Sequence, residues 1–139
     1  MDYQINSVSD QLVYIRWFRE PEEERSVEKF LQDLKQVLDN SPHPVYILSD
    51  LREGRLKNVG DVRRLAELVS NHPRFASGTS FSQDAYTPVF VDLFSKFAHQ
   101  TDRASEIWPT LEQALGYLEV LAPGVTQGID WVEIVNTLE

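Results

Sequence analysis

The chain has 139 residues, a formal net charge of −9 and no cysteine. This length suits one domain with a core of its own, and the missing cysteines exclude disulfides, thiolate catalysis and Cys-ligated zinc. The net charge argues against general affinity for nucleic acid or anionic membranes, which both need a basic surface.

The N-terminal residues predict a β-hairpin. Residues 3–8 indicate a first strand, Ser9 and Asp10 a turn, and residues 12–18 a second strand that is mostly covered on both faces. The first four residues lack the basic and apolar regions of a secretion signal. No apolar run approaches the ~20 residues that a membrane span needs, so we expect a cytoplasmic protein.

A helix and a buried strand follow the hairpin. Apolar side chains recur at helical spacing over residues 27–38, after an acidic run at residues 22–24 that suits a helix start. Residues 44–51 then form a nearly unbroken apolar run, which is typical of a strand in the middle of a sheet. The strand–helix–strand order predicts a crossover connection. Asn58 is an N-cap for a second helix, which we expect to end at residues 72–73.

The second half of the chain continues this alternation. Residues 75–81 indicate a strand, in which Gly78 predicts a bulge or a close approach of another group to the backbone. A helix with an aromatic face is expected to start at residues 87–88, and a last short strand at residues 104–108. A capping-box pattern at residues 110–113 starts another helix. The order β-β-α-β-α-β-α-β-α predicts an α/β fold with an open mixed sheet.

We expect residues 1–123 to form the α/β domain and residues 124–139 to form a C-terminal extension. Asp130 and Glu133 can cap a short amphipathic helix there, although the β-branched content leaves a strand open. Its apolar stripe comprises Trp131, Ile134, Val135 and Leu138. This stripe needs cover, either from its own domain or from a second copy in a homodimer.

Three segments together resemble the STAS-like proteins related to anti-anti-sigma factors. Residues 44–51, Pro-Val-Tyr-Ile-Leu-Ser-Asp-Leu, look like the family's central strand ending in Asp-Leu. The His-Pro-Arg-Phe at residues 72–75 resembles its junction of helix and strand, and residues 107–115 look like its last strand and the following helix start. The resemblance covers about residues 3–121 and is closest to stand-alone bacterial members grouped with lipid-binding CRAL-TRIO domains. It implies a four- to five-stranded mixed sheet with helices.

The resemblance also implies a class of function. Signalling members of the family carry a phosphorylatable serine at the start of the helix after the central strand, but residues 57–61 hold no serine or threonine. We therefore expect no phosphoswitch there. The implied function is a non-enzymatic regulatory or scaffold module that binds a protein partner. The alternative is a carrier or sensor of a small apolar or anionic ligand, such as a lipid.

The carboxyl end of the central strand is the first candidate site, because open α/β sheets bind ligands there. The residues expected to bind a partner or an anion are Asp50, Arg52, Arg55, Lys57, Asn58 and Gly60. Cations near a helix N-terminus favour phosphate or carboxylate. The alternative is that Asp50 caps the following loop and that the cations balance an acidic surface.

A second candidate site is an apolar pocket lined by Phe90, Phe94 and Phe97. These residues share a helical face, and aromatics at that spacing are more often plain core. No reaction can be read from the sequence. The three histidines are far apart without metal-ligand spacing, and no Gly-x-Ser-x-Gly motif occurs. We therefore expect no enzyme activity, no cofactor and no metal.

Overall fold

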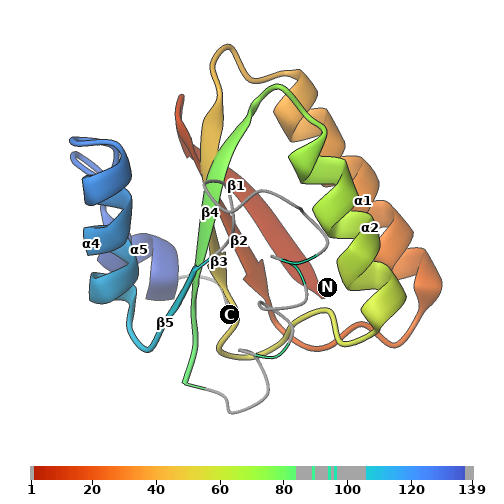
Figure 1. The fold of residues 1–139 in the computed structure, drawn as a ribbon. Coiled ribbons are helices and arrows are strands. Elements are labelled where there is room, and N and C mark those ends of the chain that lie inside the picture. Colours follow the sequence, from red (N-terminus) through yellow and green to blue (C-terminus); the bar gives the residue numbers. More distant parts are fainter. Residues whose placement is uncertain (1, 84–88, 90–93, 95, 97–105, 137–139) are drawn as a thin grey trace.

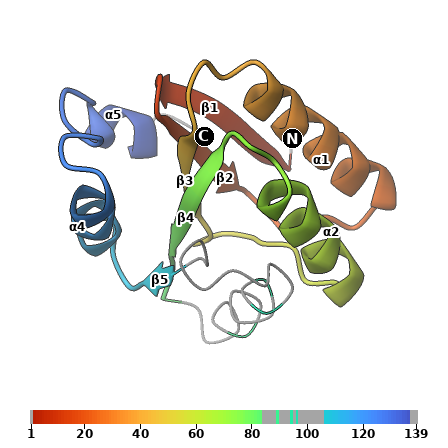
Figure 2. The same ribbon diagram turned by 45° about the horizontal axis from the view of Figure 1, so that its top comes forward.

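The computed structural model describes residues 2–83, 89, 94, 96 and 106–136. These residues form three layers, with a twisted sheet between two pairs of helices (Figure 1). The strands are β1 (Tyr3–Ser9), β2 (Leu12–Trp17), β3 (Val45–Asp50), β4 (Phe75–Phe81) and β5 (Glu106–Trp108). The helices are α1 (Glu24–Asp39), α2 (Val59–Ser70), α4 (Leu111–Leu121) and α5 (Trp131–Asn136). Helices α1 and α2 cover one face of the sheet, and α4 and α5 the other (Figures 1 and 2).

The sheet has the order β1-β2-β3-β4-β5, with β1 antiparallel to β2 and the remaining neighbours parallel. The predictions of an N-terminal hairpin, of a mixed sheet and of a central position for residues 45–50 are confirmed. The short C-terminal helix is also present. The helix predicted from residue 88 lies mostly outside the described residues.

The predicted bulge in β4 lies elsewhere than expected. The pairing of β3 with β4 shifts between Val45 and Tyr46, so that Ala76 is the extra residue, whereas Gly78 pairs in register with Ile47. The prediction of a bulge at Gly78 is therefore wrong. Gly78 instead lies in the wall of a small cavity between the sheet and the helices.

Two apolar cores lie on opposite faces of the sheet, and β2 serves both. All residues of β2 are buried, because alternate side chains enter the core under α1 and α2 or the core under α4 and α5. Helix α1 contributes the buried stripe Val27, Phe30, Leu34 and Leu38. Arg16 of β2 pairs with Asp50 of β3, so this doubly covered strand supports the carboxyl end of β3, where the candidate site begins.

The chain after α4 packs on the second core. Val125 is buried there, and the Trp131 ring lies 6.4 Å from the Tyr14 ring, centroid to centroid. Glu119 stabilises the segment between α4 and α5. Its carboxylate accepts hydrogen bonds from the backbone N–H groups of Gly124 (2.8 Å) and Thr126 (2.9 Å). The predicted cap of α5 is formed by Asp130, which accepts from the Glu133 N–H at 3.1 Å.

Candidate functional site

Asp50 ends β3 and is only 1% exposed. Its carboxylate accepts a 2.6 Å hydrogen bond from the Tyr14 hydroxyl. Arg52 donates two side-chain hydrogen bonds to the same carboxylate, at 2.9 and 2.7 Å, and its backbone N–H donates a third at 3.2 Å. Asp50 therefore caps the loop that follows β3, which is the structural alternative that the sequence left open.

Arg16 is a second buried charge beside Asp50. Its Nε lies 3.9 Å from Oδ2 of Asp50, and another of its N–H groups donates to the Val135 carbonyl at 2.8 Å. Glu53 completes the ion pairing of this guanidinium. Arg16 thus connects the sheet, the loop after β3 and α5. A lone arginine in an apolar strand marks Arg16 in the sequence but does not indicate its partners.

The protonation of the cluster follows from its burial. Burial, and then the hydrogen bond to Asp50, raise the pKa of Tyr14 far above its ordinary value. The hydrogen bonds to Asp50 likewise raise the pKa of Arg52. Tyr14 therefore remains a neutral donor and Arg52 remains a cation, so the cluster suits a structural clamp better than a proton-transfer site.

The loop after β3 packs closely against the segment that precedes α1. A Cβ added to Gly54 would lie 2.3 Å from the Arg19 carbonyl carbon, a distance that no side chain tolerates. Arg55 follows and is 8% exposed, with one of its guanidinium nitrogens 3.9 Å from a Glu20 carboxylate oxygen. Leu56 enters the core under α1 and α2. Close packing therefore limits the conformations open to this loop.

The structure does not bring the three expected cations to one point. Arg52 lies on Asp50, with its guanidinium carbon 5.2 Å from the centre of the Phe81 ring. Arg55 is turned into the wall of the cavity, and Lys57 lies in a groove with glutamates. Anion binding at the start of α2 remains a prediction, without a cluster of cations to support it.

The start of α2 is open to solvent. The Asn58 side chain accepts the Gly60 N–H at 2.8 Å, so the predicted N-cap is present. Val59 is 51% exposed. Gly60 and Lys57 are exposed as well. We call residues 57–60 the α2-start surface.

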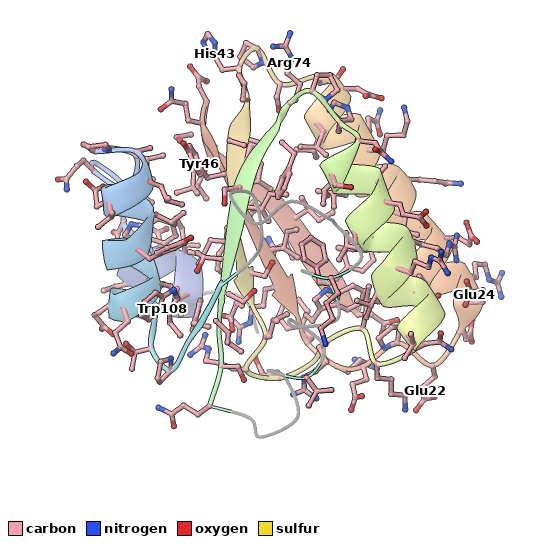
Figure 3. The ribbon with its side chains drawn as sticks, viewed as in Figure 1. Glu22, Glu24, His43, Tyr46, Arg74 and Trp108 are labelled. Atoms are coloured by element: carbon pink, nitrogen blue, oxygen red, sulfur yellow. The ribbon has the colours of Figure 1, made fainter. Side chains whose placement is uncertain are left out.

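An open groove of about 290 Å³ lies beside the α2-start surface. Its described lining comprises Pro21, Glu22, Glu23, Glu24, Val27, Lys57, Asn58 and Asp61. Figure 3 shows Glu22 and Glu24 at the outer end of α1, with their side chains on the surface. Burial, and then the negative charge of Glu24, raise the pKa of Asp61. The groove is therefore an acidic depression beside an exposed apolar residue.

The second candidate site is a small cavity between the sheet and helices α1 and α2. Its volume is about 90 Å³, well below the ~300 Å³ of typical ligand pockets. Phe94 lines it, whereas Phe90 and Phe97 lie outside the described residues. Arg55, Ser49 and Ser80 are polar groups in its wall. The space bounded by the described lining residues suits a small molecule better than a lipid chain.

The expected oligomer contacts face the chain's own core. Trp131 and Ile134 pack against the core under α4 and α5, and Val135 is buried. Val132 is the apolar residue of α5 that faces solvent, at 71% exposure. Leu138 lies outside the described residues. Self-association through this tail is still a prediction. Val132, rather than the side chains that face the core, is the apolar residue of α5 that a second copy could contact.

Two absences concern only the parts of the chain that the structure describes. Within them, no group of His, Cys, Asp and Glu is arranged to hold a metal ion. No helix there has the length and apolar character needed to cross a membrane.

Comparison with known proteins identifies the fold. No family model and no curated protein matches the chain. A solved structure from Shewanella loihica PV-4, an uncharacterised protein of the DUF3478 family with a SpoIIAA-like fold, matches with a TM-score of 0.59. The chain has a SpoIIAA-like fold. The match covers 84% of this chain and 91% of that one, at 15% sequence identity, and therefore concerns the fold alone.

The match confirms the fold that the resemblance at residues 44–51, 72–75 and 107–115 implied. Within this fold, sequence reasoning located Asp50, Arg52 and the cap at Asn58. It missed the partners that come from other strands, namely Tyr14 and Arg16. Their pairing with Asp50 depends on β2 lying next to β3, which no local pattern reveals.

Proposed function

We propose that this SpoIIAA-like chain is a non-enzymatic regulatory or scaffold module that binds a protein partner at the α2-start surface and the adjoining acidic groove. The observation that carries the proposal is the exposed Val59 beside a groove lined by carboxylates. An apolar contact with a polar, charged rim is the usual anatomy of a protein interface.

The rigidity of the neighbouring loop supports this proposal. The clamp of Asp50 by Arg52 and the packing of Gly54 on Arg19 fix the path of the chain that leads to α2. A surface that is already ordered loses little conformational entropy when a partner binds. The α2-start surface is therefore suited to recognition without rearrangement.

The charge of the groove indicates the chemistry of the partner. Glutamates before α1 and Asp61 of α2 line it, and Lys57 is the cation among the described lining residues. A segment with lysine or arginine and an apolar side chain complements both the carboxylates and Val59. No phosphorylatable residue is needed for this contact, in agreement with the absence of serine and threonine from residues 57–61.

Calorimetric titration with two matched synthetic peptides tests the proposal. One peptide alternates lysine and leucine, and the other carries glutamate in place of each lysine. We expect binding of the lysine peptide only, with an affinity that falls at least tenfold in E22K/E23K and in Val59→Ser. The control E67K/E112K, which makes the same charge change at exposed helix positions, should bind as the unaltered chain does. Equal binding of both peptides, or of both double variants, would contradict the proposal.

A second candidate function has a narrower basis. The cavity of about 90 Å³ supports binding of a small apolar molecule near Arg55 and gives little support to a lipid carrier. Native mass spectrometry of the freshly purified chain tests this alternative. A retained molecule much larger than benzene would exceed the volume of about 90 Å³ at this site and would contradict binding there.

A further inference from the structure

Strand β1 forms one edge of the sheet (Figure 2). Its sequence, Tyr-Gln-Ile-Asn-Ser-Val-Ser, contains no proline and no charged residue, although 25% of the whole chain is charged. Natural proteins protect edge strands with lysine, proline or a bulge. The register shift between Ser7 and Ser9 is the protection seen here, and it leaves the stretch from Tyr3 to Ser7 regular.

The backbone groups that this edge offers can be assigned from the ladder with β2. The Phe18 N–H donates to the Asp2 carbonyl at 2.8 Å, which makes this a hydrogen-bonded pair of the antiparallel ladder. Because such pairs alternate, Gln4 also bonds toward β2, whereas the N–H and C=O groups of Tyr3, Ile5 and Ser7 point outward. Among the described residues, no hydrogen bond to these outward groups is seen.

The edge is also accessible from the side of α1. An open groove of about 440 Å³ lies between Ser7 and the end of α1, where Gln36 and Val37 line it. The helix therefore does not cover this end of β1. Ser7 and Ser9 are exposed, and the residues between Tyr3 and Asn6 are half-buried.

The charge of the chain indicates which kind of partner could pair with the β1 edge. Two copies of a chain with a net charge of −9 repel each other over most of their surfaces. The repulsion is smallest where the surface is uncharged, and a basic partner gains nothing from an uncharged strand. The neutral edge thus fits a second copy of this chain better than it fits a partner of opposite charge.

We propose that β1 pairs with β1 of a second copy in antiparallel fashion, about a two-fold axis at Ile5. Ile5 then faces Ile5 of the other copy, and Tyr3 faces Ser7, so that all the outward backbone groups of the regular stretch are paired. In this register Gln4 of each copy lies opposite Asn6 of the other. The two sheets become one continuous sheet, and the α2-start surface of each copy stays free.

A charge-exchange experiment tests this register. Sedimentation analysis of the full chain, over a concentration series that reaches the millimolar range, should give twice the chain mass. Lysines in Q4K/N6K face lysines of the other copy, and glutamates in Q4E/N6E face glutamates, so each variant alone should be a monomer. An equimolar mixture should restore the dimer. Exposed positions on α1 and just after α2 provide the control Q32K/N71K, which should dimerise as the unaltered chain does.

Each outcome decides the matter. A full chain that is monomeric throughout the series overturns the proposal, and so does a dimer whose mass is unchanged in Q4K/N6K and Q4E/N6E. Two monomeric variants that do not combine on mixing overturn the register about Ile5. Circular dichroism melting of each variant excludes loss of folding as the cause of a monomer.

Discussion

The hydroxyl of Tyr14 on β2 donates a 2.6 Å hydrogen bond to Oδ2 of Asp50 at the end of β3, and both side chains are buried. Removing this hydroxyl leaves a buried carboxylate without one of its donors. We expect Tyr14→Phe to lower the free energy of unfolding by about 1–3 kcal/mol. Urea denaturation measures it. Tyr46→Phe is the control, because the Tyr46 hydroxyl makes no hydrogen bond to a described residue, and an equal loss there would contradict the role of the cluster.

Gly54 lies against the backbone of Arg19, and this contact sets the course of the loop that leads to α2. In Gly54→Ala the new Cβ would overlap the Arg19 carbonyl group, so the loop or the segment before α1 must move. We expect a loss of about 1–3 kcal/mol in unfolding free energy. Gly116→Ala is a matched control in α4, where a Cβ meets nothing within 4 Å. It should stabilise the chain by up to about 1 kcal/mol. A Gly54→Ala variant as stable as the unaltered chain would show that the loop is not fixed in this way.

Two aspartates are expected to respond to pH in opposite directions. Burial, followed by the nearby Glu24 charge, raises the pKa of Asp61, so its contribution to stability is present below the unfolded pKa and is lost as pH rises through the folded pKa. The hydrogen bond from Tyr3 lowers the pKa of Asp33, so its contribution is present above the unfolded pKa and is lost as pH falls through the folded pKa.

At neutral pH we therefore expect Asp61→Asn to raise the melting temperature and Asp33→Asn to lower it. Both differences should shrink when the pH falls below the ordinary range of aspartate. Thermal melts at a series of pH values provide the measurement. A lower melting temperature for Asp61→Asn at neutral pH would mean that the charge of Asp61 stabilises the start of α2.

Trp131 separates the two accounts of self-association. Its ring packs on Tyr14 and the core of its own chain, and its indole N–H donates to the Thr126 carbonyl at 3.2 Å. We expect Trp131→Ala to lower the unfolding free energy by about 3 kcal/mol without altering the mass in solution. If the tail is instead the contact between copies, Trp131→Ala reduces the mass while Q4K/N6K does not.

The sequence was sufficient where local patterns determine the structure. The apolar period of α1, the capping residues Asn58 and Thr110 and the uninterrupted run of β3 each predicted an element that the structure contains. Long-range pairing was not predictable. The basic residues after β3 are neighbours in sequence, but Arg55 turns inward because Gly54 packs on Arg19, while Arg52 turns back to Asp50.

Burial of the tail was likewise left open by the sequence. The apolar stripe of α5 could pack in a core or in an interface between copies, because both environments are apolar. The deciding contacts are made by Arg16, which donates to the Val135 carbonyl from a strand more than a hundred residues earlier. Only the order of the strands brings these groups together.

The most direct test of partner binding at the α2-start surface is a two-dimensional 1H–15N NMR titration of the full chain with the lysine–leucine peptide. We predict shift changes that concentrate in residues 21–24 and 57–61 and that are absent with the glutamate peptide. Changes that avoid both segments, or that appear equally with either peptide, would contradict the account.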